Sequence, residues 1–307
     1  MRLRFAALLL AAWPLAAMPV DDLSVAQYTT YLNGLYTHTG QSRAPGALNH
    51  GYAQTDVYDA FQRFGLTTSL DPFTYNSSTY NNVVGLLPGL VHPDRYYVLG
   101  AHYDSVANSP GADDNGSGVA GVMEAARVLS RYRFDASLLF IAFDVEEAGL
   151  RGSWAYANRQ HALGTDIRGM VSLDMIAYNY GSANRASVAC TSSNALRSTL
   201  ITALSTYSGI TANATTSSAS DHYPFEANGY QACLMIEDLS HFNPYYHSGL
   251  DSVDTAGLID YNFATNMTRA AVGYLSDSAM LVPEPALTVL TIAAALWIIR
   301  RRRSAGA

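Results

Sequence analysis

The chain has 307 residues, of which 49% are hydrophobic and 14% are charged. This composition indicates a folded chain with a substantial core and argues against a disordered polymer. Every basic residue is arginine, and residues 21–280 hold 12 of them against 24 acidic residues, a formal charge of −12 (12 − 24). An acidic segment of this kind argues against a nucleic-acid partner, because phosphate binding requires a basic surface.

The first 20 residues have the order of charged, apolar and small residues that is typical of a secretory signal peptide. Arg2 and Arg4 precede an apolar stretch that begins at Phe5, and the small residues Ala16 and Ala17 follow. The stretch is short for a membrane span, which needs about 20 residues. Residues 1–20 are therefore predicted to be a signal peptide, with an uncleaved membrane anchor as the alternative.

Apolar residues in the segment 21–280 predict helices that alternate with strands. The spacing is clearest in 119–132, where Ser117 and Gly118 stand at the expected N-cap. This alternation predicts an α/β domain whose sheet is covered by helices on both faces. Helices are expected at 22–36, 52–64, 119–132, 154–161, 194–207 and 256–275, and strands at 82–89, 96–101, 137–143, 170–173 and 233–236.

The two cysteines, Cys190 and Cys233, are too few for a disulfide-stabilised scaffold. Both lie in apolar runs that are typical of buried strands. Two free thiols in the core are the favoured expectation. A single disulfide between neighbouring strands is the alternative, since an exported protein would permit it.

Polar side chains that can bind metal follow several of the expected strands. In open α/β sheets ligands bind at the carboxyl ends of the strands. Two adjacent carboxylates at such an end repel each other unless a cation or a proton relieves them. The candidates are His102 and Asp104, the Asp113–Asp114 pair in a glycine-rich loop, the adjacent Glu146 and Glu147, Asp174, and His247.

Two histidines and several carboxylates are a donor set suited to zinc. Asp104 lies two residues after His102, so in an extended backbone it can brace the imidazole ring. The candidate set contains no cysteine, which argues against a purely structural zinc site. The sequence also lacks a Gly-x-Ser-x-Gly motif and an HExxH motif.

Six motifs in order resemble the co-catalytic zinc peptidase family of bacterial leucyl aminopeptidases and glutamate carboxypeptidase II. They are GAHYDS, PGADDNGSG, FDVEEAGLRGS, SLDM, SDH and NPYYHSGLD, and they cover roughly residues 80–275. The resemblance implies a single α/β domain with a central mixed β-sheet. It also implies peptide or protein substrates, hydrolysed by a secreted exopeptidase of the aminopeptidase type.

The resemblance assigns a role to each matching residue. Asp114 would bridge two zinc ions, and the general base would be Glu146. Tyr246 would polarise the scissile carbonyl group, as a tyrosine does in some members, and Asp104 would support His102. A cis peptide bond would precede Asn115. The remaining metal ligands would be His102 and Asp174 on one ion, and Glu147 and His247 on the other.

Three alternatives stay open on the same scaffold. A carboxypeptidase would use the same two-zinc site on the other end of a peptide. A glutaminyl cyclase shares nearly all of these residues but works with one zinc ion. A non-catalytic ectodomain, of the kind related to transferrin receptors, keeps the fold and loses ligands.

The C-terminal residues 281–307 are predicted to form a sorting tail beyond a peptidase domain of residues 21–280. Pro283 and Pro285 interrupt the preceding structure, residues 286–299 are apolar, and four arginines follow at 300–303. This pattern resembles the PEP-CTERM sorting signal of Gram-negative bacteria, with a simple tail anchor as the alternative. The resemblance implies cleavage by an exosortase-type protease after signal peptidase has acted. We therefore expect an extracytoplasmic protein, held transiently at the inner membrane and then released or attached at the cell surface.

Overall fold

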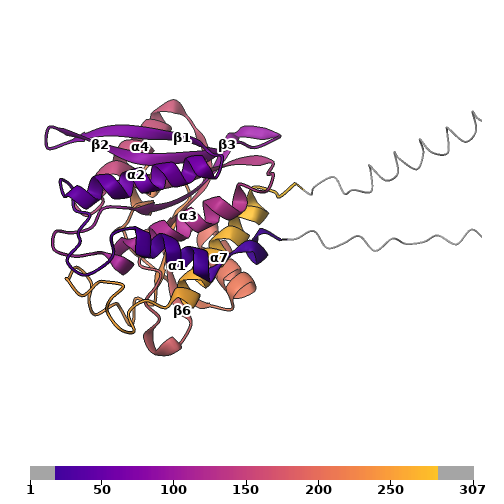
Figure 1. The fold of residues 1–307 in the computed structure, drawn as a ribbon. Helices are drawn as coiled ribbons and strands as arrows, with labels where there is room; N and C mark the ends of the chain where they lie inside the picture. Colours follow the sequence, from indigo (N-terminus) through magenta and orange to yellow (C-terminus); the bar gives the residue numbers. More distant parts are fainter. Residues whose placement is uncertain (1–17, 283–307) are drawn as a thin grey trace, which may run out of the picture.

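A computed structural model of the chain describes residues 18–282, which fold around one sheet of eight strands (Figure 1). The strands are β1 (Thr67–Tyr75), β2 (Ser78–Leu87), β3 (His92–His102), β4 (Ala136–Phe143), β5 (Asp166–Leu173), β6 (Arg185–Ala189), β7 (Thr211–Thr215) and β8 (Ala232–Glu237).

The sheet is mixed, with the order β1-β2-β4-β3-β5-β8-β6-β7. Its four central strands β4, β3, β5 and β8 are parallel. At one edge β1 and β2 pair antiparallel, and at the other edge β6 runs antiparallel to β8 and parallel to β7. The prediction of a single α/β domain with a central mixed sheet is confirmed.

Helices cover both faces of the sheet. Helices α1, α3 and α7 pack beside one another in front of the sheet in Figure 1, with α2 against β1 and β2. Helices α4 and α6 pack together on the opposite face. The helices are α1 (Val25–Gly34), α2 (Leu48–Arg63), α3 (Gly118–Leu129), α4 (Arg151–Leu163), α5 (Ala195–Ala203), α6 (His222–Ala227) and α7 (Tyr261–Ser278).

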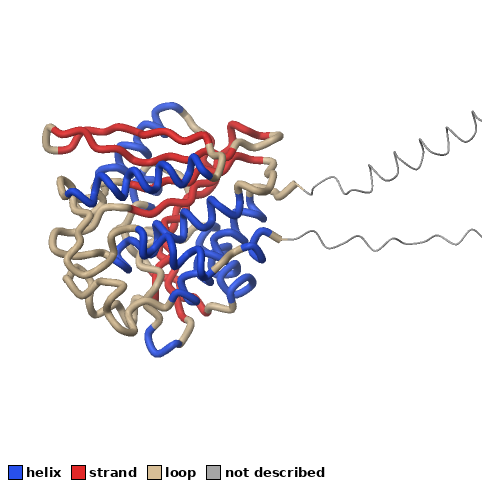
Figure 2. The backbone as a smooth tube through the Cα atoms, in the orientation of Figure 1, coloured by secondary structure: helices blue, strands red, loops and turns tan. Residues whose placement is uncertain are grey.

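The centre of the sheet is buried on both faces. All eight residues of β4, ASLLFIAF, are buried. A continuous apolar run of this kind is typical of a parallel strand between two helical layers. Because β4, β3 and β5 are parallel neighbours, their carboxyl ends meet at one edge of the sheet. Figure 2 shows long loops gathered at one side of the molecule, and the loop 238–260 is among them.

Three elements were not expected from the sequence, namely β1, β7 and α6, whereas β6 corresponds to the apolar run at Cys190 that was expected to be a buried strand. Strand β7 (TANAT) has five residues, and none of them is buried. Strand β1 exposes or half-exposes every residue except Phe73. Edge strands of this kind lack the apolar pattern on which the prediction depends.

The start of α3 differs from the expectation. Ser117 has helical backbone angles and its hydroxyl makes no capping bond. Instead the amide N–H of Gly118 donates to Asn115 Oδ1 at 2.9 Å. The Asn115 side chain therefore caps α3, while the Ser117 hydroxyl donates to the Asp113 carbonyl at 2.7 Å.

The favoured expectation of two free thiols is wrong. Cys190, directly after β6, and Cys233 in β8 form a disulfide, with their Cα atoms 4.8 Å apart. The register pairs Ala189 with Leu234 on these antiparallel strands, so the next residues on each strand stand opposite each other. The disulfide between neighbouring strands, which was the alternative, is the arrangement found, because β6 and β8 pair directly.

The two ends of the described chain lie close to α7 and to the start of β4. Val20 is buried, and Arg269 of α7 donates to its carbonyl oxygen at 2.5 Å. Leu281 forms a bridge with Phe134, just before β4.

No helix between residues 18 and 282 is long and apolar enough to cross a membrane. The predicted tail helix 286–299, the Arg cluster and residues 1–17 of the signal peptide lie outside the described residues.

Candidate active site

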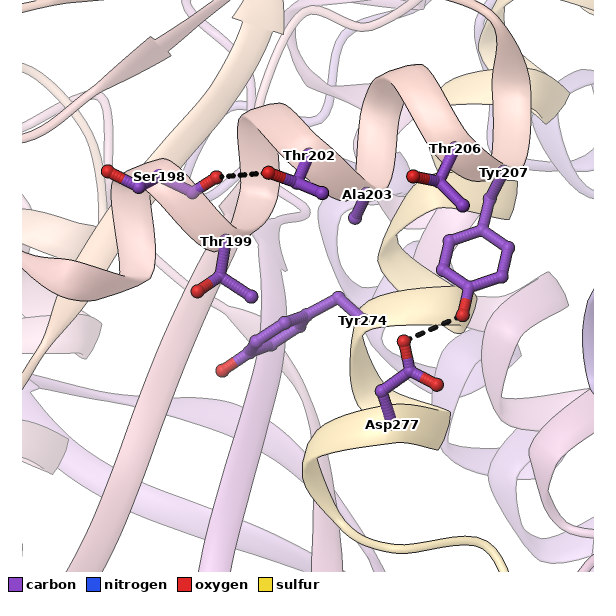
Figure 3. Close-up of a pocket in the computed structure, with 8 residues that line it drawn as sticks. All are labelled: Ser198, Thr199, Thr202, Ala203, Thr206, Tyr207, Tyr274 and Asp277. Carbon is purple, nitrogen blue, oxygen red and sulfur yellow. Dashed lines mark hydrogen bonds between the residues drawn. The ribbon is translucent and has the colours of Figure 1, made fainter.

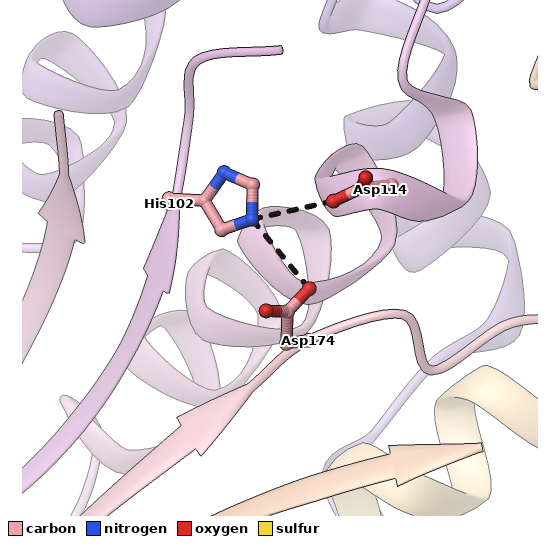
Figure 4. Close-up of side chains that lie close together, drawn as sticks. All are labelled: His102, Asp114 and Asp174. Atoms are coloured by element: carbon pink, nitrogen blue, oxygen red, sulfur yellow. Dashed lines mark ion pairs between the residues drawn. The ribbon is translucent and has the colours of Figure 1, made fainter. Parts of the chain in front are cut away.

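One group of potential metal ligands lies at the carboxyl ends of two parallel strands. His102 is the last residue of β3, Asp174 follows β5, and Asp114 lies in the segment η2 (Ala112–Ser117) that leads into α3. His102 Nε2 is 3.3 Å from Asp114 Oδ1 and 3.5 Å from Asp174 Oδ1 (Figure 4). The three ligand atoms all lie within 4.8 Å of one another, close enough for one cation.

A second group shares Asp114 with the first. His247 Nε2 is 3.1 Å from Asp114 Oδ2 and 3.0 Å from Glu147 Oε2. The two oxygens of Asp114 thus face different histidines. The structure brings together all five residues predicted as ligands, in two groups with Asp114 in the bridging position.

Glu146 lies beside both groups and belongs to neither. Its Oε2 is 4.0 Å from His102 Nε2, and it lines a cavity of about 120 Å³ together with Asp174 and Tyr246. The ring of Tyr246 stacks on His247 with the centroids 3.7 Å apart. The predicted base and the predicted carbonyl-polarising tyrosine therefore open onto the same space as the ligand groups.

Asp104 supports the site through two contacts. The Nδ1–H of His102 donates to the Asp104 backbone oxygen at 3.3 Å, whereas the carboxylate is 3.5 Å from Nδ1. The carboxylate accepts the amide N–H groups of Glu146 and Glu147 at 3.0 and 3.2 Å. Asp104 therefore orients the His102 ring mainly through its carbonyl group, and its carboxylate holds the turn that carries both glutamates.

The protonation of the site reflects buried carboxylates close together. Burial, followed by the nearby Asp114 charge, raises the pKa of Glu147 to about 8. Burial also raises the pKa of Glu146 well above its ordinary value, although His102 opposes the shift. Burial would raise the pKa of Asp114 too, but hydrogen bonds from His102 and His247 lower it to about 2. A divalent cation would displace these protons and relieve the repulsion.

The residues present fit zinc. Because His102 Nδ1 donates to a carbonyl group, Nε2 is the nitrogen with a free lone pair. Asp174 Oδ1 is buried and accepts no hydrogen bond within the described chain, as is expected of an oxygen atom that binds a metal ion. Imidazole nitrogens and carboxylate oxygens are ligands that zinc accepts, and each group offers three of them. These three observations support a metal centre in which both groups are ligands.

The structure adds residues to which the sequence analysis gave no role. Ser220 donates to Asp174 Oδ2 at 2.7 Å, and so fixes the carboxylate of that ligand. Asp251 accepts the amide N–H groups of Asp113 and Asp114 at 2.9 and 3.1 Å. Asp221 is fully buried, and burial raises its pKa to about 7. The motifs SDH and NPYYHSGLD contain these residues, but only the folded chain shows what they contact.

A separate surface groove contains no such chemistry. It lies between α5, the segment η4 (Leu204–Ser208) and α7, and is lined by hydroxyl and aromatic groups (Figure 3). The hydroxyl of Thr202 donates to the Ser198 carbonyl, and the hydroxyl of Tyr207 donates to Asp277 at 2.6 Å. These polar groups are already paired with one another, and the groove contains none of the residues predicted as ligands or base.

Known proteins include aminopeptidases that are similar to this chain in sequence and in fold. Aminopeptidase YwaD of Bacillus subtilis is 33% identical over 232 residues, which are 72% of this chain and 50% of that protein. The chain thus spans about half the length of this curated relative. The crystal structure of the Legionella pneumophila LapA aminopeptidase has a TM-score of 0.75 at 21% identity and covers 88% of this chain and 78% of its own.

A glutaminyl cyclase has the same fold. The crystal structure from Macrostomum lignano has a TM-score of 0.71 at 18% identity, covering 87% of this chain and 92% of its own. At these identities the structural likeness shows the fold alone. The model of Peptidase family M28 matches residues 82–275, which carry every residue of the two ligand groups. The chain belongs to peptidase family M28.

Proposed function

We propose that this chain is an exported two-zinc exopeptidase that removes N-terminal residues from peptides. The observation that carries the proposal is the pair of ligand groups that share Asp114, with Glu146 directly beside them. Membership of family M28 and the aminopeptidase name of the Bacillus subtilis relative support it. All the residues needed for two cations and a base are present, which argues against a non-catalytic ectodomain.

The catalytic roles follow from where the side chains lie. Bound zinc would supply Lewis-acid chemistry, polarising the substrate carbonyl group and acidifying a water molecule. Glu146 would accept the proton of that water and later deliver it to the leaving amine. The Tyr246 hydroxyl would donate to the carbonyl oxygen as negative charge develops there. Burial raises the pKa of Tyr246, so this hydroxyl keeps its proton at neutral pH.

The lining of the cavity favours a free amino terminus over a free carboxyl terminus. Among the described residues around it, none is arginine or lysine, so no such side chain would pair with a terminal carboxylate. Its remaining wall is largely apolar, formed by Met175, Leu234, Ile236, Leu239 and Phe242. We therefore propose an aminopeptidase that prefers an apolar N-terminal side chain.

A panel of aminoacyl anilides tests the proposal. The purified chain, loaded with zinc, should hydrolyse leucyl and methionyl anilides faster than aspartyl or arginyl anilides, and a chelator should abolish the activity. Two zinc equivalents per chain are expected by metal analysis. The glutaminyl cyclase alternative predicts pyroglutamate, not free glutamine, from an N-terminal glutamine peptide. Release of C-terminal residues from N-acetylated peptides, without turnover of the aminoacyl anilides, would indicate a carboxypeptidase.

We also propose the cellular route that the two ends suggest. A signal peptide would direct export, and the tail 281–307 would hold the domain briefly at the membrane before an exosortase-type protease acts. Because Pro19 and Val20 are buried in the fold, cleavage near Ala17 fits better than cleavage after residue 20. A variant that ends at Val282 retains the bridge from Leu281 to Phe134, so it should keep full activity but mislocalise. Loss of folding in this variant, or an intact tail on the mature surface protein, would contradict the proposal.

A further inference from the structure

The turn that carries Glu146 and Glu147 begins with a strained residue. Val145 follows β4 and has a φ of +55°, in the left-handed region. A β-branched side chain rarely adopts this conformation, because its Cβ crowds the backbone. Such strain persists only where surrounding contacts hold it, and it often marks a functional site. The contacts around Val145 therefore decide how firmly the two glutamates are held.

A buried aspartate provides the contact on the strand side of the turn. Asp144 is fully buried, and its Oδ1 accepts the amide N–H of Val145 at 2.8 Å. The same Oδ1 accepts a hydrogen bond from His50 Nε2 at 2.7 Å. The hydroxyl of Tyr103 donates to Oδ2 at 2.6 Å. Asp104 holds the next two amides, so two aspartates together fix three consecutive N–H groups of the turn.

His50 comes from a distant part of the chain. It lies in the first turn of α2, and its side chain is almost completely buried. Its ring packs beside Tyr103, with the centroids 5.2 Å apart. Residue 50 precedes the segment 82–275 that the family model matches. Helix α2 thus contacts the catalytic turn through this side chain and the carboxylate of Asp144.

We infer that His50 is a positioning residue for the catalytic turn: through Asp144 it holds Val145 in its strained conformation, so that Glu146 and Glu147 face the metal centre. The expected loss of kcat rests on the proposed peptidase function. The expected change in the structure of the turn does not. Without His50 the buried Oδ1 of Asp144 loses its outer donor, and the carboxylate can turn away from Val145. The turn would then relax, and the glutamates would shift from their positions.

The test compares four variants by kinetics and by hydrogen exchange. His50→Phe keeps a ring but removes the donor, and His50→Gln keeps an N–H near the Nε2 position. His92→Phe is the matched control, because His92 forms a half-buried pair with Asp135 (3.0 Å) at the start of β3 and β4, away from the ligand groups at the ends of these strands. Val145→Gly, combined with His50→Phe, removes the crowding that makes the turn strained.

We expect His50→Phe to lower kcat about 10- to 100-fold with KM within about threefold, as a misplaced catalytic group does. His50→Gln and His92→Phe should stay within about threefold of the wild type. Adding Val145→Gly to His50→Phe should recover kcat at least about fivefold, since glycine adopts the turn without strain. Exchange of the peptide spanning 144–150, in the zinc-loaded chain, should accelerate about tenfold in His50→Phe alone.

Three results would overturn the inference. The first is a wild-type kcat and wild-type hydrogen exchange in His50→Phe. The second is a loss of kcat in His50→Gln as large as that in His50→Phe. The third is an equally large loss of kcat in His92→Phe. If His50→Phe does not fold, Tyr103→Phe takes its place, because it removes the other side-chain donor to Asp144. We expect about a three- to tenfold lower kcat and faster exchange in that variant, and wild-type values would refute the role. If the wild type hydrolyses no anilide, the proposed function fails, while the exchange data still decide the positioning role.

Discussion

Replacing Glu146 by glutamine separates the predicted base from the predicted metal ligands. Glutamine has nearly the same size as glutamate but cannot accept a proton at neutral pH. The nearest imidazole nitrogen, His102 Nε2, is 4.0 Å from Glu146, compared with 3.3 Å from Asp114 and 3.5 Å from Asp174. Glu146→Gln should therefore leave both ligand groups intact and remove only the proton transfer.

The size of the effect follows from the role of a general base. Loss of such a group costs about 10²- to 10⁴-fold in rate, or about 3–5 kcal/mol of transition-state stabilisation at 1.36 kcal/mol per tenfold change. Glu147→Gln is the matched control from the same turn. Its carboxylate is 3.0 Å from His247 Nε2, so the amide should weaken zinc binding as well as turnover.

The assay measures kcat on leucyl anilide together with zinc content for the two variants and the wild type. Glu146→Gln should keep two zinc equivalents and lose activity, whereas Glu147→Gln should lose both. If Glu146→Gln retains more than a tenth of the wild-type rate, Glu146 is not the base. If it loses zinc to the same extent as Glu147→Gln, the assignment of ligand and base within the pair is wrong.

Three further outcomes are expected. In the zinc-free chain Glu147 binds its proton more tightly when folded, with a pKa of about 8 against 4.5, so the free energy of unfolding should fall as pH rises through this range. Urea midpoints between pH 5 and pH 8 measure the fall, which added zinc should remove. Ser220→Ala leaves one oxygen of Asp174 without its donor, and competition with a chelator should show about 10- to 100-fold weaker zinc binding. Cys190→Ser with Cys233→Ser opens a loop of 43 residues, and the urea midpoint should report a loss of about 4 kcal/mol if chain entropy dominates.

The central part of the fold could be predicted because its signal is local. Strand β4 is a continuous apolar run, and α3 has apolar residues at helical spacing. The apolar residues of both elements are buried, as their patterns predict. The edge strands β1 and β7 are too exposed to show such a pattern. The pairing of β6 with β8, which brings Cys190 to Cys233, is not visible in either strand alone. Which strands pair with each other is decided by tertiary structure, and the periodicity of apolar residues does not predict it.

The residues proposed as metal ligands could be predicted from the sequence, but the residues that hydrogen-bond to the site could not. His102, Glu147 and Asp174 stand directly after apolar runs, so their positions at one edge of the sheet follow from topology. The supports come from distant segments and have no local pattern. Ser220 reaches Asp174 across 46 residues of sequence, and His50 reaches Asp144 across 94. Only tertiary structure brings such pairs together.

Arg43 shows most clearly what the sequence conceals. It lies in the polar stretch QSRAPG, where an arginine is expected to be exposed. In the structure it is 1% exposed, and its guanidinium donates to the carbonyl groups of Tyr103 at 2.8 Å and Gly111 at 2.9 Å. Tyr103 directly follows His102 in the sequence, and Gly111 lies three residues before Asp114.

Two side chains from the N-terminal segment therefore support the candidate site from outside the two ligand groups. Arg43 ties together the backbones that carry His102 and Asp114, and His50 braces the turn that carries Glu146. Both precede residues 82–275, the segment that defines the family. That segment contains every proposed ligand and the proposed base. On its own it would leave the carbonyl groups around Arg43 and the carboxylate of Asp144 without their buried donors. The unit that can hold this site in working geometry consequently extends from the N-terminal helices to α7.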